Sequence, residues 1–341
     1  MKKRLLAMLL AAAMCTGLAA CSSDTGTATT PEGGETAESG DGSYNIDVIL
    51  KTTASEYWQY VQAGAMAYQK DNPNVTVTVK GAPSETSYQE QLNMIQTDLA
   101  GDYDGFVIAP LQADMVANLI EGQTKPIVAV DTKIEAPEVI SFVGTGNESA
   151  GALGGAAAVE AAKAAGWTDI KAIEIAGVQG DTTNTDRMNG YMKGIEEAGG
   201  DFLEDEVQYA DAVATKAVDA MNGIMSRYPD GIAIICANND DMAIAAAKAA
   251  ADSGNEAYAN TIFLGFDGIQ SACDAILEGR LTMSVAQQGY EMGYMAVEAV
   301  VNNLNGEDVE EFIDSGADVV TADNAQERKE TLQGYLDALE A

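Results

Sequence analysis

From Tyr44 to the C-terminus, short apolar runs alternate with longer segments in which apolar residues recur at helical spacing. The apolar runs of the first half are expected strands, at 46–51, 75–80, 105–109 and 127–131. The expected helices between them are 57–70, 86–100 and 114–121. Strands and helices that alternate in this way form a parallel sheet covered by helices.

The alternation starts again in the second half of the chain. Its expected strands are 171–176, 232–236, 262–265, 281–286 and 317–321. The expected helices are 149–165, 185–198, 212–227, 240–251, 268–278, 289–303 and a last one at the C-terminus. About 300 residues follow Tyr44, which is more than one hydrophobic core usually holds. We therefore expect an α/β fold with two doubly wound parallel-sheet lobes.

The N-terminus has the pattern of an export signal. A basic start at residues 2–4 precedes an apolar run, 5–18, that is shorter than the roughly 20 residues of a membrane span. The run ends in Leu18-Ala19-Ala20-Cys21, which predicts a lipoprotein signal peptide over 1–20 and a lipidated Cys21. An ordinary secretory signal that happens to contain a cysteine is the alternative. The polar stretch 21–44 reads as a flexible tether.

The charge balance and the residue types exclude several functions. With 18 basic and 53 acidic residues, the chain has a net charge of −35, which argues against nucleic acid or anionic lipid as a partner. It contains no histidine, the commonest general base and metal ligand, and no nucleophile motif, so we expect no enzyme, no metal and no cofactor. Cys236 and Cys273 are expected to be buried free thiols, with a disulfide as the alternative.

Polar residues end several of the expected strands, where ligands bind in doubly wound sheets. Asp131, Asn239, Asp267 and Gln287 offer the donors and acceptors that hydroxyl groups need. Taken singly, Asn239 could be a helix cap and Asp267 part of a turn. Lys51 ends an apolar strand, an unusual place for a charge without a partner or ligand. Together these residues predict one shared polar cleft.

Two further features suit a ring with hydroxyl groups. Tyr57 and Trp58 open the first helix and could stack on the apolar face of a sugar, although core packing explains such aromatics equally well. Arg187 lies near the start of a helix, and its guanidinium could bind two hydroxyls. The alternative for Arg187 is a surface ion pair with Asp186.

The segments LKTTASEYW, VDTK, TDRMNGY, ANNDDMA, GFDG and SVAQQ follow one another in an order that resembles the type I periplasmic sugar-binding proteins of ABC transporters, in particular the ribose- and allose-binding branch. The resemblance covers roughly residues 45–341. It implies three crossings between the lobes, near 145–146, 287–288 and 314–316. The N-terminal lobe would then comprise 45–145 plus 288–316, and the C-terminal lobe 146–287 plus 317–341.

The resemblance also implies a set of ligand-binding residues: Lys51, Ser55, Tyr57, Trp58, Asp131, Thr132, Arg187, Asn239, Asp267 and Gln287. The chain departs from the family at three places. Thr132 replaces an arginine or an acidic residue, Ala212 stands where an aromatic closes the second ring face, and Ser55-Glu56 replaces Asn-Pro. These departures leave the identity of the sugar open.

The implied protein is a monomer that captures a pentose or hexose for ABC-transporter import by hinge closure. It would be anchored through Cys21 at the outer face of the cell membrane or in the periplasm. A receptor subunit that presents a sugar or an autoinducer to a sensor kinase or chemoreceptor is the alternative.

Overall fold

The computed structural model describes residues 42–340. The expected signal peptide, Cys21 and the tether up to residue 41 lie outside the described residues. Cys236 and Cys273 are free and buried, as expected. None of the helices within 42–340 is long and apolar enough to cross a membrane.

The first sheet has six strands, and every neighbouring pair in it is parallel. Its order is β12 (Phe312–Asp314), β5 (Val139–Gly144), β4 (Ile127–Val130), β3 (Gly105–Ile108), β1 (Tyr44–Thr52) and β2 (Val75–Ala82). The central strands β3 and β4 are buried along their whole length, as in a sheet covered on both faces.

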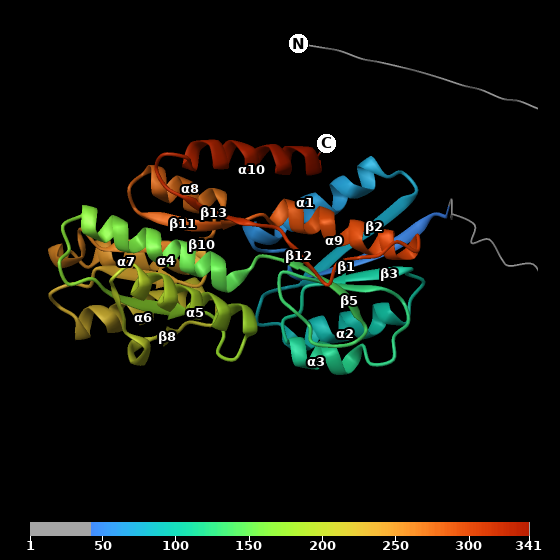
Figure 1. The fold of residues 1–341 in the computed structure, drawn as a ribbon, viewed down its shortest axis with the longest axis horizontal. Coiled ribbons are helices and arrows are strands. Elements are labelled where there is room, and N and C mark those ends of the chain that lie inside the picture. Colours follow the sequence, from blue (N-terminus) through green and yellow to red (C-terminus); the bar gives the residue numbers. More distant parts are fainter. Residues whose placement is uncertain (1–41, 341) are drawn as a thin grey trace, which may run out of the picture. The chain divides into compact units, whose positions relative to one another are not determined.

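Two pairs of helices cover the first sheet (Figure 1). On one face lie α1 (Glu56–Asp71) and α9 (Gly289–Leu304), and on the other α2 (Tyr88–Leu99) and α3 (Ala113–Leu119). Glycines allow α1 and α9 to approach closely, because a Cβ on Gly64 would lie 1.8 Å from the carbonyl oxygen of Tyr290. A Cβ on Gly293 would lie 1.9 Å from that of Val61. A helix from late in the chain therefore completes the core of the first sheet.

The second sheet runs in the order β13 (Ala317–Val320), β11 (Met283–Gln287), β10 (Ile262–Asp267), β9 (Ile234–Ala237), β6 (Lys171–Ala176) and β7 (Asp201–Phe202), and β8 (Gln208–Tyr209) also pairs with β6. All its pairs are parallel except the one between β11 and β13. The expected fold class is thus confirmed, with one antiparallel edge strand that the sequence pattern did not indicate.

Helices also cover both faces of the second sheet. On one face lie α4 (Asn147–Ala164) and α5 (Thr182–Glu197). The other face carries α6 (Ala214–Arg227), α7 (Asp240–Asp252) and α8 (Gln270–Leu277). The last helix, α10 (Ala325–Glu340), packs on α8 and also contacts α1 (Figure 1). Two short 3-10 helices, η1 (Glu204–Glu206) and η2 (Glu256–Tyr258), complete this half.

Three connections join the elements of one sheet to those of the other. They run from β5 to α4, from β11 to α9 and from β12 to β13, and the three expected crossings lie at these connections or include the last residue of the strand before them. The division of the chain into two lobes at these points stays a prediction. The strands β5 and β12 were missed because β12 has only three residues and both strands carry half-buried or exposed side chains.

Candidate functional site

A cavity of about 410 Å³ is lined by residues that follow strands of both sheets. All but one of the residues that the sequence singles out line it: Lys51, Ser55, Tyr57, Trp58, Asp131, Arg187, Asn239, Asp267 and Gln287. The exception, Thr132, is buried; its hydroxyl donates to Asp131 Oδ2 at 2.9 Å and lies 3.1 Å from the hydroxyl of Thr183. The structure thus brings the expected residues together, and their contact with a ligand stays a prediction.

On the side of the first sheet, Asp131 is the centre of a buried polar cluster. Tyr57 donates its hydroxyl to Asp131 Oδ1 at 3.0 Å, and Lys51 Nζ lies 3.4 Å from Oδ2. Burial disfavours the charge on Lys51, but the carboxylates of Asp131, Asp181 and Glu85 outweigh burial and raise the pKa of Lys51. The ammonium group therefore stays charged at the edge of the cavity.

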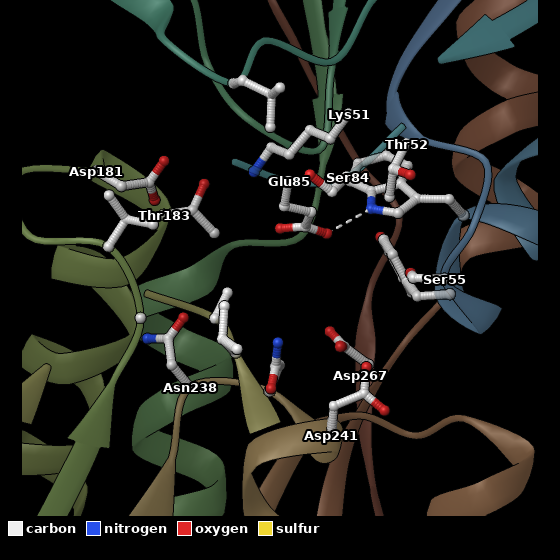
Figure 2. A pocket seen from close by; sticks show the side chains of 18 of the residues that line it. Lys51, Thr52, Ser55, Ser84, Glu85, Asp181, Thr183, Asn238, Asp241 and Asp267 are labelled. Carbon is white, nitrogen blue, oxygen red and sulfur yellow. Dashed lines mark hydrogen bonds between the residues drawn. The ribbon is translucent and has the colours of Figure 1, made fainter. Parts of the chain in front are cut away.

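Trp58 is held in place by its neighbours. Its indole Nε1 donates to Glu85 Oε1 at 2.8 Å, the contact drawn as a dashed line in Figure 2. The ring packs edge-on against Tyr57 with centroids 5.1 Å apart, and Lys51 Nζ lies 5.9 Å from the indole centroid. Trp58 is 2 % exposed and still lines the cavity, so its side chain both packs in the core and presents part of its surface to the site.

On the side of the second sheet, Arg187 is fixed by several contacts. Its Nε donates to Asn147 Oδ1 and its Nη1 to the carbonyl of Asn238, both at 2.8 Å. The guanidinium lies over the ring of Phe266, 3.8 Å from the centroid. Its ion-pair partner is Asp267, with Nη1 3.7 Å from Oδ1. The surface ion pair with Asp186 that the sequence left open is not formed.

Asp267 and Gln287 form the floor of the cavity next to Arg187. Gln287 Nε2 donates to Asp267 Oδ1 at 2.7 Å, which orients the amide. Gln287 Oε1 is buried and has no hydrogen-bond partner. Burial raises the pKa of Asp267 well above its usual range, although Arg187 opposes the shift. A buried carbonyl oxygen without a donor is costly, so Gln287 Oε1 is an acceptor that the described residues leave unused.

Asn239 is partly a structural residue. Its Oδ1 accepts the backbone N–H of Met242 at 2.9 Å, so it is the N-cap of α7, the alternative that the sequence left open. Its Nδ2 group and the second lone pair of Oδ1 are left for a ligand.

Several residues that line the cavity were missed from the sequence: Glu85, Asp181, Thr183, Asn184, Asn238 and Asp241. Glu85 lies in the loop after β2, so the rule that located the other strand ends could have found it. Asp181 is the N-cap of α5 and accepts the N–H of Asn184 at 2.8 Å, a role that gave no hint of a site. Figure 2 shows both carboxylates directed toward the space beside Lys51.

The cavity carries more negative than positive charge. Five carboxyl side chains line it, those of Glu85, Asp131, Asp181, Asp241 and Asp267, against the two cations of Lys51 and Arg187. In residues 42–340 there is no group of three or more His, Cys, Asp or Glu side chains placed to bind a metal ion. The cavity therefore offers an excess of carboxylate acceptors, together with the aromatic side chains of Tyr57, Trp58 and Tyr88.

Residues 46–308 match the family model for the periplasmic binding protein domain. The chain is 29% identical over 265 residues to the D-allose-binding periplasmic protein of Escherichia coli, covering 75% of this chain and 83% of that one. It is 26% identical over 268 residues to the ribose import binding protein of Salmonella typhimurium, covering 78% and 86% of the two chains.

A solved structure supports the same grouping. The carbohydrate transporter solute-binding protein of Agrobacterium radiobacter, in complex with D-arabinose, superposes with a TM-score of 0.78 at 26% identity. The match covers 86% of this chain and 99% of that one. Proteins of the matching family bind solutes outside the cytoplasm and are not enzymes. The resemblance seen in the sequence is thus confirmed, and the chain belongs to the periplasmic binding protein domain family.

Proposed function

We propose that the protein captures an uncharged monosaccharide, a pentose or a hexose, outside the cytoplasm and delivers it to an ABC permease. The observation that carries the proposal is the cavity itself, because it combines fixed acceptors and donors with the indole of Trp58. Sugars offer hydroxyls that donate and accept, and a weakly polar ring face that stacks on aromatics. Relatives named for D-allose and ribose support the same ligand class.

Each side of the cavity would supply part of the contacts. Asp131 and Asp267 would accept from ring hydroxyls, and Arg187 would donate to hydroxyl or ring oxygens. Gln287 Oε1, which has no hydrogen-bond donor among the described residues, would accept a hydrogen bond from a hydroxyl of the sugar. Ala212 lines the cavity. The resemblance implies an aromatic at this position, so one ring face would meet a smaller side chain and the site would have room for a bulkier sugar.

The binding cycle would be a hinge closure of two lobes, of which periplasmic binding proteins are a standard example. A sugar that contacts residues of both sheets stabilises the closed form by its differential affinity for that form. The closed form would then dock on the permease. We further propose that the protein is a monomer and that Cys21 is acylated. An intact-mass measurement showing unmodified Cys21, or cleavage at another residue, would contradict the anchor.

A thermal-shift screen tests the ligand class. The protein lacking residues 1–21 is melted with pentoses, hexoses, polyols, nucleosides and amino acids. A ligand at about 1,000 times its dissociation constant adds roughly 4 kcal/mol to the free energy of unfolding, which gives an easily visible shift. Stabilisation by a pentose or hexose supports the proposal. Stabilisation by an amino acid or nucleoside alone contradicts it.

A further inference from the structure

A contact outside the cavity joins two segments that contribute to its lining. Glu56, in the first turn of α1, accepts two hydrogen bonds from Ser271, in the first turn of α8. Glu56 Oε1 accepts the Ser271 backbone N–H at 3.2 Å, and Oε2 accepts the Ser271 hydroxyl at 2.7 Å. α1 covers the first sheet and α8 the second, so the contact connects the two halves of the fold.

The contact supplies what α8 lacks. The first backbone N–H groups of a helix have no partner within the helix and need an acceptor. The N-cap of α8 is Ile269, whose apolar side chain makes no capping hydrogen bond. The Glu56 carboxylate takes the place of the missing cap, and its negative charge is favourable at the positive end of the helix.

A tyrosine reinforces the pair. Tyr60, one turn after Glu56 on α1, donates its hydroxyl to Glu56 Oε1 at 2.7 Å. The backbone N–H of Gln270 in turn donates to the Tyr60 hydroxyl at 3.4 Å. Two side chains of α1 therefore satisfy successive N–H groups at the start of α8.

The position of the pair links it to the site. Glu56 stands between Ser55 and Tyr57, which line the cavity, and Ser271 follows Asp267 and Ile269, which line it from the other half. Glu56 and Ser271 do not line the cavity themselves. An effect of the pair on the site would therefore pass through these neighbouring residues.

We propose that Glu56 is a positioning residue that sets sugar affinity by capping α8 from the other half of the fold, through a contact that opening of the two lobes would break. The inference rests on the proposed function, because it needs two lobes that open and close. A contact made only in the closed form raises the fraction of protein that is competent to hold ligand, and the apparent affinity rises with that fraction.

The test compares Glu56→Ala, Glu56→Gln, Ser271→Ala and the Glu56→Ala/Ser271→Ala double variant by calorimetric titration with D-allose and D-ribose. The matched control is Glu90→Ala, since Glu90 is an exposed glutamate of α2. Loss of charge-assisted hydrogen bonds predicts a dissociation constant raised about tenfold in Glu56→Ala. Ser271→Ala should raise the dissociation constant less than Glu56→Ala does. The dissociation constant of Glu56→Gln should lie between those of the wild type and Glu56→Ala. The double variant should be no weaker than Glu56→Ala, because both changes remove the same contact.

A purely structural role for Glu56 would lower the melting temperature and leave the dissociation constant unchanged in the folded variant, which would overturn the inference. Additive effects of Glu56→Ala and Ser271→Ala would overturn it as well. Small-angle X-ray scattering supplies a readout that needs no ligand. Without sugar, Glu56→Ala should have a larger radius of gyration than the wild type and the Glu90→Ala control, and equal radii would overturn the inference.

The scattering readout also separates the two proposals. If the wild type binds no sugar and Glu56→Ala still opens the molecule, the proposed function fails and the role of Glu56 in closure stands. If the wild type binds D-allose or D-ribose and Glu56→Ala matches it in affinity and in radius, the function stands and the role of Glu56 fails.

Discussion

Lys51 and Asp131 form an ion pair across the end of β1 and the end of β4, with 3.4 Å between Nζ and Oδ2. Their side chains are 12% and 4% exposed, so the pair is largely shielded from water. The Tyr57 hydroxyl donates to the same carboxylate. Removing Asp131 would leave the shielded Lys51 ammonium with only the carboxylates of Asp181 and Glu85 to offset its burial.

Asp131→Ala should therefore abolish sugar binding and also destabilise the protein. Loss of the carboxylate leaves the Lys51 ammonium and the Tyr57 hydroxyl without their partner, at a cost of about 3 kcal/mol. Chemical denaturation and a titration with the sugar from the screen measure the two effects. Glu135→Gln is the control, because it breaks the exposed pair with Lys133 and should change stability by less than about 1 kcal/mol. An Asp131→Ala variant with wild-type affinity would remove this residue from the site.

The excess of carboxylates in the cavity predicts that anionic sugars are rejected. A ligand phosphate would meet Glu85, Asp181 and Asp241 with only two cations to offset them. D-ribose 5-phosphate should therefore bind at least about a hundredfold more weakly than D-ribose, which is about 2.7 kcal/mol. Glu85→Gln and Asp181→Asn should narrow this difference. Equal affinity of the wild type for both ligands in a competition titration would contradict the prediction.

Trp58 is expected to contribute through its ring surface. Trp58→Ala removes the stacking surface and the bond to Glu85, and should weaken sugar binding by about ten- to a hundredfold. Trp58→Phe keeps an aromatic face without the N–H donor and should weaken it less. Circular dichroism verifies that both variants are folded, since Trp58 is buried in the core. If Trp58→Ala binds the sugar as tightly as the wild type does, the indole contributes to core packing and not to ligand binding.

The buried carboxyl group of Glu174 should make the free energy of unfolding depend on pH. It is fully buried behind the cavity wall, with Asn238 Nδ2 donating to its Oε1 at 3.3 Å. Burial raises the pKa of Glu174 from 4.5 to about 8, and the hydrogen bond from Asn238 opposes the shift only in part. The folded protein thus retains a proton that the unfolded chain loses above its own pKa, so the contribution of Glu174 to stability falls as pH rises.

The fall should take place between about pH 4.5 and 8, with a slope of at most about 1.4 kcal/mol per pH unit. Glu174→Gln has no proton to lose and should show a flatter profile over this range. Denaturation at a series of pH values measures both proteins. Parallel profiles would show that Glu174 does not titrate in this range.

Much of the site followed from the sequence for one physical reason. Parallel strands end at a common edge of each sheet, so the strand pattern could place Lys51 near Asp131 in the first sheet and Asp267 near Gln287 in the second. That both edges line one cavity depends on how the two sheets are arranged, which the strand pattern does not contain. Thr132 was the exception. Asp131 has a positive φ of 64°, and the Thr132 hydroxyl points to Asp131 and Thr183 instead of lining the cavity.

Other parts of the site depend on contacts that no local pattern contains. Arg328 of α10 donates to the carbonyl of Gln287 at 2.6 Å and to that of Gly268 at 3.2 Å. An arginine of the last helix thus binds the backbone at the ends of β10 and β11, which line the site. The residues Asp181 and Thr183 were missed for a related reason, because polar residues at a helix start have a sufficient structural explanation.

The edge strand β12 has a consequence for the order in which the chain can fold. It pairs with β5 through Phe312↔Phe142 and its two following residues, so it lies beside a strand made far earlier in synthesis. A growing chain that stops before residue 312 leaves the edge of β5 open and lacks the ring stacked on Phe142. The first sheet therefore gains its last strand only when most of the chain has been made, and we expect a C-terminally truncated product to present the edge of β5 to other chains.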